Sequence, residues 1–413
     1  MPLAFHTDRS SERATEPHRS SASASSVSSE EGNWNWPEML AQIAYRMGAL
    51  NLFGRLSQKY EMSWRNRGRL PAFQRALQPK YAILCYHRVG TEGIPYYSTL
   101  PPALFELQMR FLRENFRVIS LSQLCHELTI PRNEGHGVAV TFDDGYSDLY
   151  THALPVLRKF EIPATVYLTV DCIETGEVAW YDRIFLALQV AEGEEIELPI
   201  SGRSRCPLGS PRQRVEAGTQ IVSILRNTPV LERRRICAAL EQQASLPADK
   251  LEGRMLSWKQ IHEMRCAGIS LGSHTLSHPV LSQLAVEDID RELGESKRVL
   301  EARLGEPVLD FAFPFGKPED YGPIAYAAVK RFGYRSAVTT IWGTNIPGSD
   351  MSALRRLRLG EERTGAKFGL QLHREFFQAR EAAAPFAASG PAHWSSKGAY
   401  AHSSALMAGE TDA

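Results

Sequence analysis

The sequence predicts an α/β fold whose core is a mostly parallel sheet, either open or closed into a barrel. From residue 81 onward, short runs rich in β-branched and aromatic residues alternate with amphipathic helical segments. Several of these helical segments end on a residue that tolerates a left-handed backbone and then lead into a strand, namely Asn115, Gly268, Gly305 and Gly333. Strand and helix that alternate this regularly indicate parallel strands joined by helical crossovers.

Seven strands are predicted in order along the chain, at residues 81–86, 117–119, 137–142, 164–168, 269–272, 309–313 and 335–339. Two of the intervening helices are predicted at residues 257–267 and 286–304. In the second helix, the apolar side chains recur on one face, as expected of a helix that covers a sheet.

Residues 171–256 interrupt this alternation, because they are charged, favour helix and contain no clear strand run. A structureless loop of that length is improbable inside a compact domain, so we predict a helical insertion. The insertion could act as a lid over the site, or it could have no role there. The predicted organisation is a disordered tail at 1–32, an amphipathic helical segment at 33–79, the α/β domain at 80–360, a terminal helix at 361–380 and a disordered tail at 381–413.

Composition excludes some classes of function. Lys+Arg and Asp+Glu both number 47 in 413 residues, so the chain lacks the basic excess of a nucleic-acid-binding protein. The six cysteines are scattered without a C-x-x-C pair and are predicted to be free thiols. No signal peptide and no apolar run of about 18 residues is visible, which favours a cytoplasmic or membrane-peripheral protein. The helical pattern at 34–59 could rest on a membrane surface or pack on the protein itself.

Two short motifs carry candidate chemistry. Asp143 and Asp144 directly follow the apolar strand at 137–142, and His274 and His278 follow the strand at 269–272. Reactive groups of parallel α/β folds gather where strands end, so both motifs are expected on one rim. Two imidazoles four residues apart can reach one ion, and a carboxylate with open positions completes a catalytic metal site. Neighbouring residues at a strand end point in different directions, so one aspartate can bind the metal while the other faces its water.

Two further segments reach the same rim. The strand at 309–313 leads into Phe313-Pro314-Phe315. An aromatic side chain there can form one wall of a sugar-binding site, and its backbone N–H can face a developing oxyanion. His87 lies just past the first strand and could orient a ligand or the substrate, or simply be hydrogen-bonded.

In their order along the chain, three motifs resemble the polysaccharide deacetylase family with the NodB homology domain, carbohydrate esterase family 4, in its bacterial exopolysaccharide-associated branch. They are Thr141-Phe142-Asp143-Asp144-Gly145, His274-Thr275-Leu276-Ser277-His278 and Phe311-Ala312-Phe313-Pro314-Phe315-Gly316. The resemblance covers residues 80–359 apart from the insertion, and it implies a distorted (β/α)7 TIM-like barrel.

The resemblance also implies roles for individual residues. Asp143 matches the general base, and Asp144, His274 and His278 match the metal triad. Phe315 matches the aromatic residue whose backbone N–H helps to bind the oxyanion. The remaining expected substrate contacts are His87, Tyr146, Trp180, Tyr181, Asp182, Phe313 and Pro314.

The chain departs from the family at two places. Many members have an arginine two residues before the motif's proline that steadies the base, whereas this chain has Ala312. Many members also have a late histidine that serves as general acid, but residues 354–359 contain none. His373, in the predicted terminal helix, has a similar local pattern. A metal-bound water or a residue of the insertion is the alternative proton donor.

The predicted function is therefore the metal-dependent hydrolysis of N-acetyl groups on an amino-sugar glycan. Zinc is the first choice for a His-His-Asp set, and Co²⁺, Ni²⁺, Fe²⁺ or Mn²⁺ would also fit. Two alternatives stay open: hydrolysis of a cyclic amide or ureide by a barrel of the same type, and a carbohydrate-binding pseudoenzyme.

Overall fold

The structure is a computed structural model, and it describes residues 79–91, 99–130, 135–200, 203–359 and 365–377. The predicted tails at 1–32 and 381–413 and the amphipathic segment at 34–59 lie outside these residues. Among the helices of the described ranges, none is long and apolar enough to cross a bilayer.

Seven parallel strands form the core, as predicted from the sequence. Their order in the sheet is β1-β2-β3-β6-β7-β8-β9, so each strand pairs with the next core strand along the chain. Their bounds are β1 Tyr81–Tyr86, β2 Gly137–Phe142, β3 Ala164–Leu168, β6 Ser270–Ser273, β7 Asp310–Ala312, β8 Ser336–Trp342 and β9 Leu354–Arg356. β1 and β2 are buried along their whole length, which fits strands covered on both faces.

The sheet closes into a barrel between its first and last strands. Leu357, just beyond β9, bridges in parallel to Leu84 of β1. The Leu357 N–H donates to the Ile83 carbonyl at 2.8 Å, and the Cys85 N–H donates to the Leu357 carbonyl at 3.0 Å. The predicted distorted (β/α)7 barrel is confirmed, and closure leaves the core strands few unpaired edges.

One predicted strand is wrong, although the predicted number of seven holds. Residues 117–119 make only a single parallel bridge, from Val118 to Val138 of β2. β3 pairs with β2 further along that strand, from Val140 onward. The seventh strand is instead β9, whose sequence Leu-Arg-Arg does not look like a buried barrel strand. Its Arg356 is nevertheless fully buried, for a reason that the functional site supplies.

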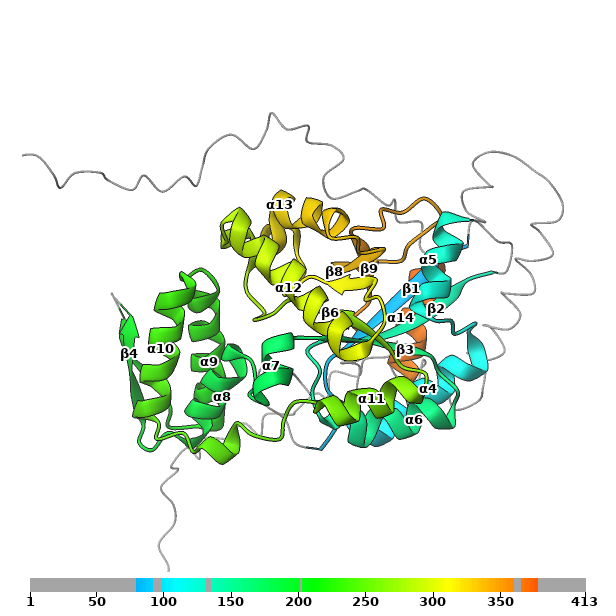
Figure 1. Cartoon of the computed structure of the whole chain (residues 1–413). Coiled ribbons are helices and arrows are strands. Elements are labelled where there is room, and N and C mark those ends of the chain that lie inside the picture. Colours follow the sequence, from blue (N-terminus) through cyan, green and yellow to red (C-terminus); the bar gives the residue numbers. More distant parts are fainter. Residues whose placement is uncertain (1–78, 92–98, 131–134, 201–202, 360–364, 378–413) are drawn as a thin grey trace, which may run out of the picture.

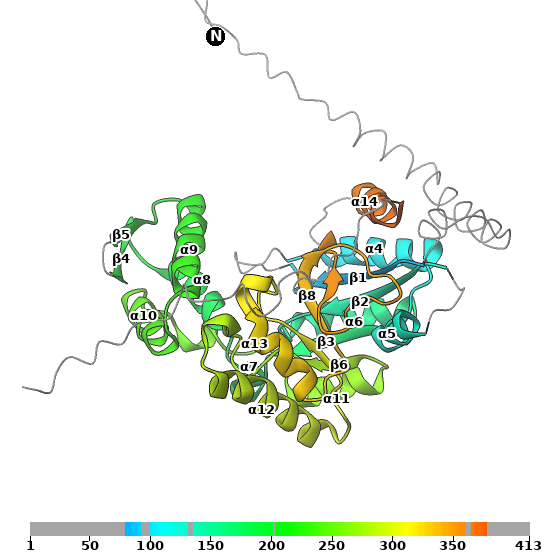
Figure 2. The same cartoon turned by 90° about the horizontal axis from the view of Figure 1, so that it is seen from above.

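Helices cover the outside of the barrel (Figures 1 and 2). The covering helices are α4 Pro102–Asn115, α5 Leu121–Thr129, α6 Leu154–Lys159, α11 Trp258–Cys266, α12 Val286–Leu304, α13 Pro318–Arg331 and α14 Gly365–Phe377. The predicted helices at 257–267 and 286–304 correspond to α11 and α12. In α11 the Ser257 side chain and Gln260 form a reciprocal capping box, which fixes where the helix begins.

The segment between β3 and α11 forms a largely helical lobe that stands to one side of the barrel (Figures 1 and 2). It contains α7 Val170–Thr175, α8 Trp180–Val190, α9 Pro211–Arg226 and α10 Val230–Gln243. It also contains an antiparallel hairpin, β4 Glu195–Ile200 and β5 Arg203–Pro207, which the sequence analysis missed. The hairpin alternates charged with apolar residues, because one face packs on the lobe while the other faces solvent.

Gly272 illustrates how tightly the barrel interior is packed. A Cβ atom at this position of β6 would lie 2.5 Å from the Tyr167 ring and 2.8 Å from the Asp310 carbonyl oxygen. We expect Gly272→Ala to destabilise the protein by about 1–3 kcal/mol, since an overpacked core must shift backbone or rotamers. Thermal unfolding of this variant tests the expectation, with Gly209→Ala, where the nearest atom is the flexible end of Gln213, as the matched control. Equal melting temperatures for the two variants would contradict it.

Candidate functional site

Three predicted metal ligands meet at the C-terminal ends of β2 and β6. The Nε2 atoms of His274 and His278 each lie 3.5 Å from Oδ1 of Asp144. Two ligand atoms of one tetrahedral zinc ion, at bond lengths of about 2.0–2.2 Å, are about 3.4 Å apart. All three side chains are buried, and Asp144 Oδ2 has no hydrogen-bond partner among the described residues. The donor set therefore fits one divalent metal ion.

Burial without a cation disfavours the charged form of every member of this triad. Desolvation, followed by the charges of Asp143 and Asp182, raises the pKa of Asp144 well above its usual value. Burial lowers the pKa of His274 and that of His278, which keeps both imidazoles neutral. Neutral imidazoles are the form that binds a metal, and a divalent cation would supply the positive charge that the Asp144 carboxylate lacks.

Hydrogen bonds outside the triad hold these ligands in place. Nδ1 of His274 bonds to the Ala312 carbonyl at 2.7 Å, which leaves Nε2 for the metal. The Tyr181 hydroxyl donates to Asp144 Oδ1 at 3.1 Å. Glu292 of α12 accepts from the N–H groups of Leu276 and Ser277 at 2.9 and 3.0 Å, and so fixes the loop that carries both histidines.

Backbone strain is concentrated at the same place. Among the described residues, six non-glycine residues have positive φ, and four of them belong to the site motifs: Asp144 (73°), Thr275 (69°), His278 (53°) and Phe315 (59°). Such conformations each cost about 1–3 kcal/mol and persist where the surrounding structure enforces them. Strained residues gather at functional sites, so their clustering supports this place as the candidate site.

Asp143 is held by an arginine that the sequence analysis did not identify. Arg356 of β9 donates from Nη1 to Oδ1 and from Nη2 to Oδ2, both at 2.7 Å, and its Nε donates to the Thr339 carbonyl at 2.8 Å. Burial alone would raise the pKa of Asp143, but the charge and hydrogen bonds of Arg356 outweigh it and hold that pKa well below its usual range. Asp143 is therefore a buried carboxylate that stays ionised.

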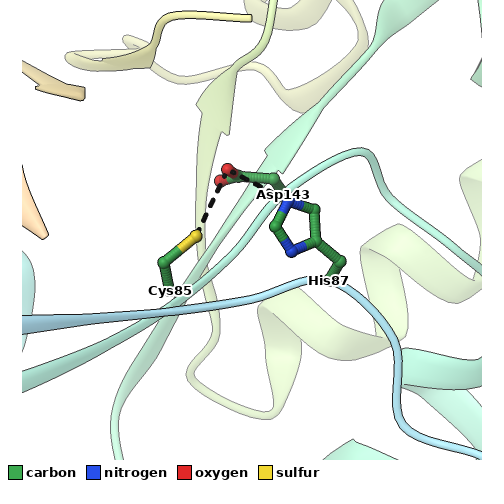
Figure 3. A group of neighbouring side chains, drawn as sticks. All are labelled: Cys85, His87 and Asp143. Carbon is green, nitrogen blue, oxygen red and sulfur yellow. Dashed lines mark hydrogen bonds and ion pairs between the residues drawn. The ribbon is translucent and has the colours of Figure 1, made fainter. Parts of the chain in front are cut away.

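Two more side chains face Asp143, as Figure 3 shows. The Cys85 thiol donates to Oδ2 at 3.6 Å, and Nε2 of His87 lies 3.9 Å from the same oxygen. Cys85, His87 and Asp143 have donor atoms within 4.8 Å of one another, as a metal site would require. However, Arg356 places its positive charge on both Asp143 oxygens, so we do not expect a cation there.

The start of the insertion is built into the wall of the site. Trp180 Nε1 donates to the His278 carbonyl at 3.4 Å. The Tyr146 hydroxyl donates to Asp182 at 2.6 Å, and burial raises the pKa of Asp182 to about 7. The insertion is thus attached through α8 to two of the residues that are predicted to bind metal, His278 and Asp144.

The predicted substrate contacts fall into two groups. Tyr146, Tyr181, Asp182, Phe313 and Pro314 are buried, and the Phe313 ring stacks on Tyr321 at 4.1 Å. The contact of these five side chains with substrate stays a prediction. His87, Trp180 and Phe315 are partly exposed, and their contact with substrate stays a prediction. The Phe315 ring lies 4.9 Å from the His278 ring and under the Arg226 guanidinium at 4.3 Å.

His373 lies elsewhere. Its ring packs 5.0 Å from Phe116 beside α4, and burial lowers its pKa to about 4. α14 carries it against the outer surface of α4 rather than to the end of β2 (Figure 2). The role of proton donor that the local sequence pattern suggested is therefore not available to His373.

Residues 131–337 match the sequence model of the polysaccharide deacetylases, a span that is half of the chain. The chain belongs to the polysaccharide deacetylase family. Hydrolysis of the N-acetyl amide bonds of polysaccharides is the reaction of this family, and the chain is an enzyme of that class.

Two known proteins resemble this deacetylase, one over most of its length and the other over a short segment. YxkH of Bacillus subtilis, assigned to the polysaccharide deacetylases, is 23% identical over 292 residues, which are 70% of this chain and 75% of YxkH. The poly-β-1,6-N-acetyl-D-glucosamine N-deacetylase of Escherichia coli K12 is 35% identical over 89 residues, 20% of this chain and 13% of that protein.

Two solved structures are also similar. The Streptococcus pyogenes deacetylase PplD, in complex with acetate, gives a TM-score of 0.48 at 20% identity and covers 72% of this chain and 99% of its own. IcaB from Ammonifex degensii gives a TM-score of 0.44 at 21% identity and covers 73% and 98%.

Proposed function

We propose that this deacetylase is metal-dependent, with Asp144, His274 and His278 as metal ligands and Asp143 as general base. The observation that carries the proposal is that two neighbouring aspartates have different surroundings. Asp144 faces two neutral imidazoles at 3.5 Å, as a metal ligand should, while Asp143 is kept ionised by Arg356. The proposed substrate is an N-acetylated amino-sugar glycan.

Zinc is the proposed metal, because two imidazoles and one carboxylate with open coordination positions are typical of catalytic zinc. Co²⁺, Ni²⁺, Fe²⁺ and Mn²⁺ accept the same ligands. When bound, such an ion polarises the acetyl carbonyl and lowers the pKa of a water molecule.

The protein's own groups perform the remaining steps of the proposed mechanism. Asp143 accepts the proton of the attacking water. Because its pKa is depressed, Asp143 is a weak base, and it can take this proton only from a water molecule whose own pKa is lowered. The backbone N–H of Phe315, held in a left-handed conformation, donates to the developing oxyanion.

His87 is the proposed carrier of the proton to the leaving amine. Its Nε2 lies 3.9 Å from Asp143 Oδ2, which is the closest approach of an imidazole to the base among the described residues. Burial lowers the pKa of His87 to about 4, so a proton that His87 takes from Asp143 is readily given up again. From there it reaches the amine nitrogen as the amide C–N bond breaks.

Acetate release from N-acetylglucosamine oligomers by the purified protein tests this function. We expect bound metal in the purified protein, loss of activity after chelation, and recovery when Zn²⁺ or Co²⁺ is added back. His274→Ala should lose both metal and activity. Release of no acetate from any glycan by a fully metal-loaded protein would overturn the proposal, and hydrolysis of a cyclic amide instead would favour that alternative reaction.

Tyr181→Phe is expected to weaken metal binding by about 10–100-fold, because it removes the hydrogen bond that orients Asp144. The measurement is the dissociation constant of Zn²⁺ for the full chain, obtained by competition with a chelator. Tyr150→Phe, which removes a hydroxyl bonded to the exposed Glu263, serves as the matched control and should keep the wild-type constant. An unchanged constant in Tyr181→Phe would show that Asp144 needs no such support.

A further inference from the structure

We propose that Arg226 of the insertion is a positioning residue for Phe315, whose N–H is the proposed oxyanion donor, and this inference rests on the function proposed above. Arg226 is the last residue of α9, and its guanidinium lies 4.3 Å from the centre of the Phe315 ring. A cation within about 6 Å of an aromatic centroid is attracted to the face of the ring. The insertion is then a working part of the site rather than an appendage that has no role there.

The loop that carries Phe315 also fixes Arg226. Nη2 of Arg226 donates to Oδ1 of Asp320, near the start of α13. Only 4% of Asp320 is exposed, and its Oδ2 accepts from the Lys317 N–H at 3.1 Å. Lys317 lies two residues beyond Phe315. The guanidinium is therefore paired with a buried carboxylate of the same loop whose aromatic ring it covers.

The Phe315 backbone is strained and depends on its neighbours. Its φ of 59° is a left-handed value, which a non-glycine residue keeps only where the surrounding structure enforces it. Thr340 holds the backbone: its hydroxyl donates to the Phe315 carbonyl at 2.6 Å, and its N–H donates to the Gly316 carbonyl at 2.9 Å. The ring contacts Arg226 and, at 4.9 Å between ring centres, His278. Loss of the Arg226 contact lets the strain relax, which turns the N–H away from the oxyanion.

The insertion touches the same loops at two further points. Asn227, which follows α9, accepts at Oδ1 from the Gln283 side chain at 3.1 Å, and Gln283 lies five residues beyond His278. At the start of α8, Trp180 donates to the His278 carbonyl, and its ring centre lies 6.4 Å from that of Phe315. Two helices of the insertion, α8 and α9, therefore support the loops on which the proposed reaction depends.

The test compares Arg226→Met with Arg226→Lys in the full-length, metal-loaded protein. Removal of one oxyanion donor lowers kcat by about 10²–10³-fold, and Arg226→Met displaces the donor without removing it. We therefore expect kcat for acetate release from an N-acetylglucosamine oligomer to fall about tenfold, while KM and bound metal stay within about twofold of wild type. Arg226→Lys keeps a cation beside Phe315 and Asp320, and it should recover most of the lost kcat.

Arg183→Met is the matched control, because Arg183 is an arginine of the same lobe with similar burial and a similar ion pair. Its side chain is 24% exposed, against 29% for Arg226. It donates to Glu241 from Nε and Nη2 at 2.7 and 2.6 Å, and its other partner, Glu177, also belongs to the insertion. Arg183→Met should weaken the lobe and keep the wild-type kcat. An equal fall in kcat in this control, or an unchanged kcat in Arg226→Met, overturns the inference.

Hydrogen exchange separates a failure of this inference from a failure of the proposed function. If the wild type releases no acetate from any oligomer, the proposed function fails, and the exchange rate of residues 313–321 then decides the role of Arg226. Faster exchange of this segment in Arg226→Met than in wild type and Arg183→Met supports Arg226 as the residue that holds the loop. Equal exchange in the three proteins overturns the inference as well.

Discussion

Asp143→Asn is expected to lower kcat/KM for acetate release by about 10²–10⁴-fold while the protein keeps its metal, because this is the usual contribution of a positioned general base. Asparagine is nearly isosteric with aspartate but cannot accept a proton from water at neutral pH. The proposed metal ligands are untouched, since Asp144, His274 and His278 form their cluster without Asp143. Bound metal and kcat/KM should be measured on the same folded preparation.

Asp144→Asn is the matched comparison for this experiment, because it changes the neighbouring carboxylate in the same way. It should lose metal affinity as well as activity. The reverse pattern, with metal lost in Asp143→Asn and retained in Asp144→Asn, would show that the two aspartates have exchanged roles. Full activity in Asp143→Asn would remove the general base from the mechanism altogether.

Arg356→Met is expected to destabilise the protein by about 3–5 kcal/mol near neutral pH, because it leaves a buried carboxylate without its counter-charge. In the wild type the folded pKa of Asp143 lies below its unfolded value of about 3.9. The ion pair therefore stabilises the fold above that pH, and this stabilisation is lost only as the pH falls through the folded pKa.

In the variant, Asp143 loses the charge and hydrogen bonds of Arg356 that outweigh burial, so its pKa should rise above the unfolded value. Ionisation then opposes folding, so the stability difference from wild type should grow between acid and neutral pH. The acid limb of the pH–rate profile should move to higher pH. Denaturant unfolding from pH 4 to pH 8 and the pH dependence of kcat/KM check both statements.

Arg358→Met is the control for this variant, since Arg358 lies two residues further along and is exposed. It should unfold like the wild type. The double variant Asp143→Leu, Arg356→Met should recover much of the lost stability, because a buried ion pair replaced by apolar side chains is often neutral. A pH-independent stability difference in the single variant would mean that packing, rather than charge, makes Arg356 necessary.

The cluster of Asp144, His274 and His278 could be predicted from the sequence because its signal is local. Asp144 ends one apolar strand, His274 and His278 follow another, and the rule that parallel strands end on one rim brings them together. The partner of Asp143 could not be predicted in this way. Ala312 replaces the arginine expected before the proline, and the substitute comes from a strand of three residues that no hydrophobic pattern marks.

Glu292 was missed for a related reason. It lies in the middle of α12, where a glutamate normally faces solvent, and only the packed structure shows it buried beneath Leu276 and Ser277. The insertion could be predicted because its sequence shows no clear strand run. Its hairpin could not, because charged residues on the exposed face interrupt the apolar pattern of the two strands. In each case the missing information was a tertiary neighbour, which propensity and periodicity do not contain.

The position of Arg356 in the last barrel strand links the charge of Asp143 to the closure of the barrel. The proposed metal ligands and Asp143 all precede β8 along the chain, whereas the guanidinium that keeps this carboxylate charged follows it. Closure of β9 onto β1 delivers that charge and seals the sheet in a single event. We therefore expect Asp143 to gain its counter-charge only as the barrel closes.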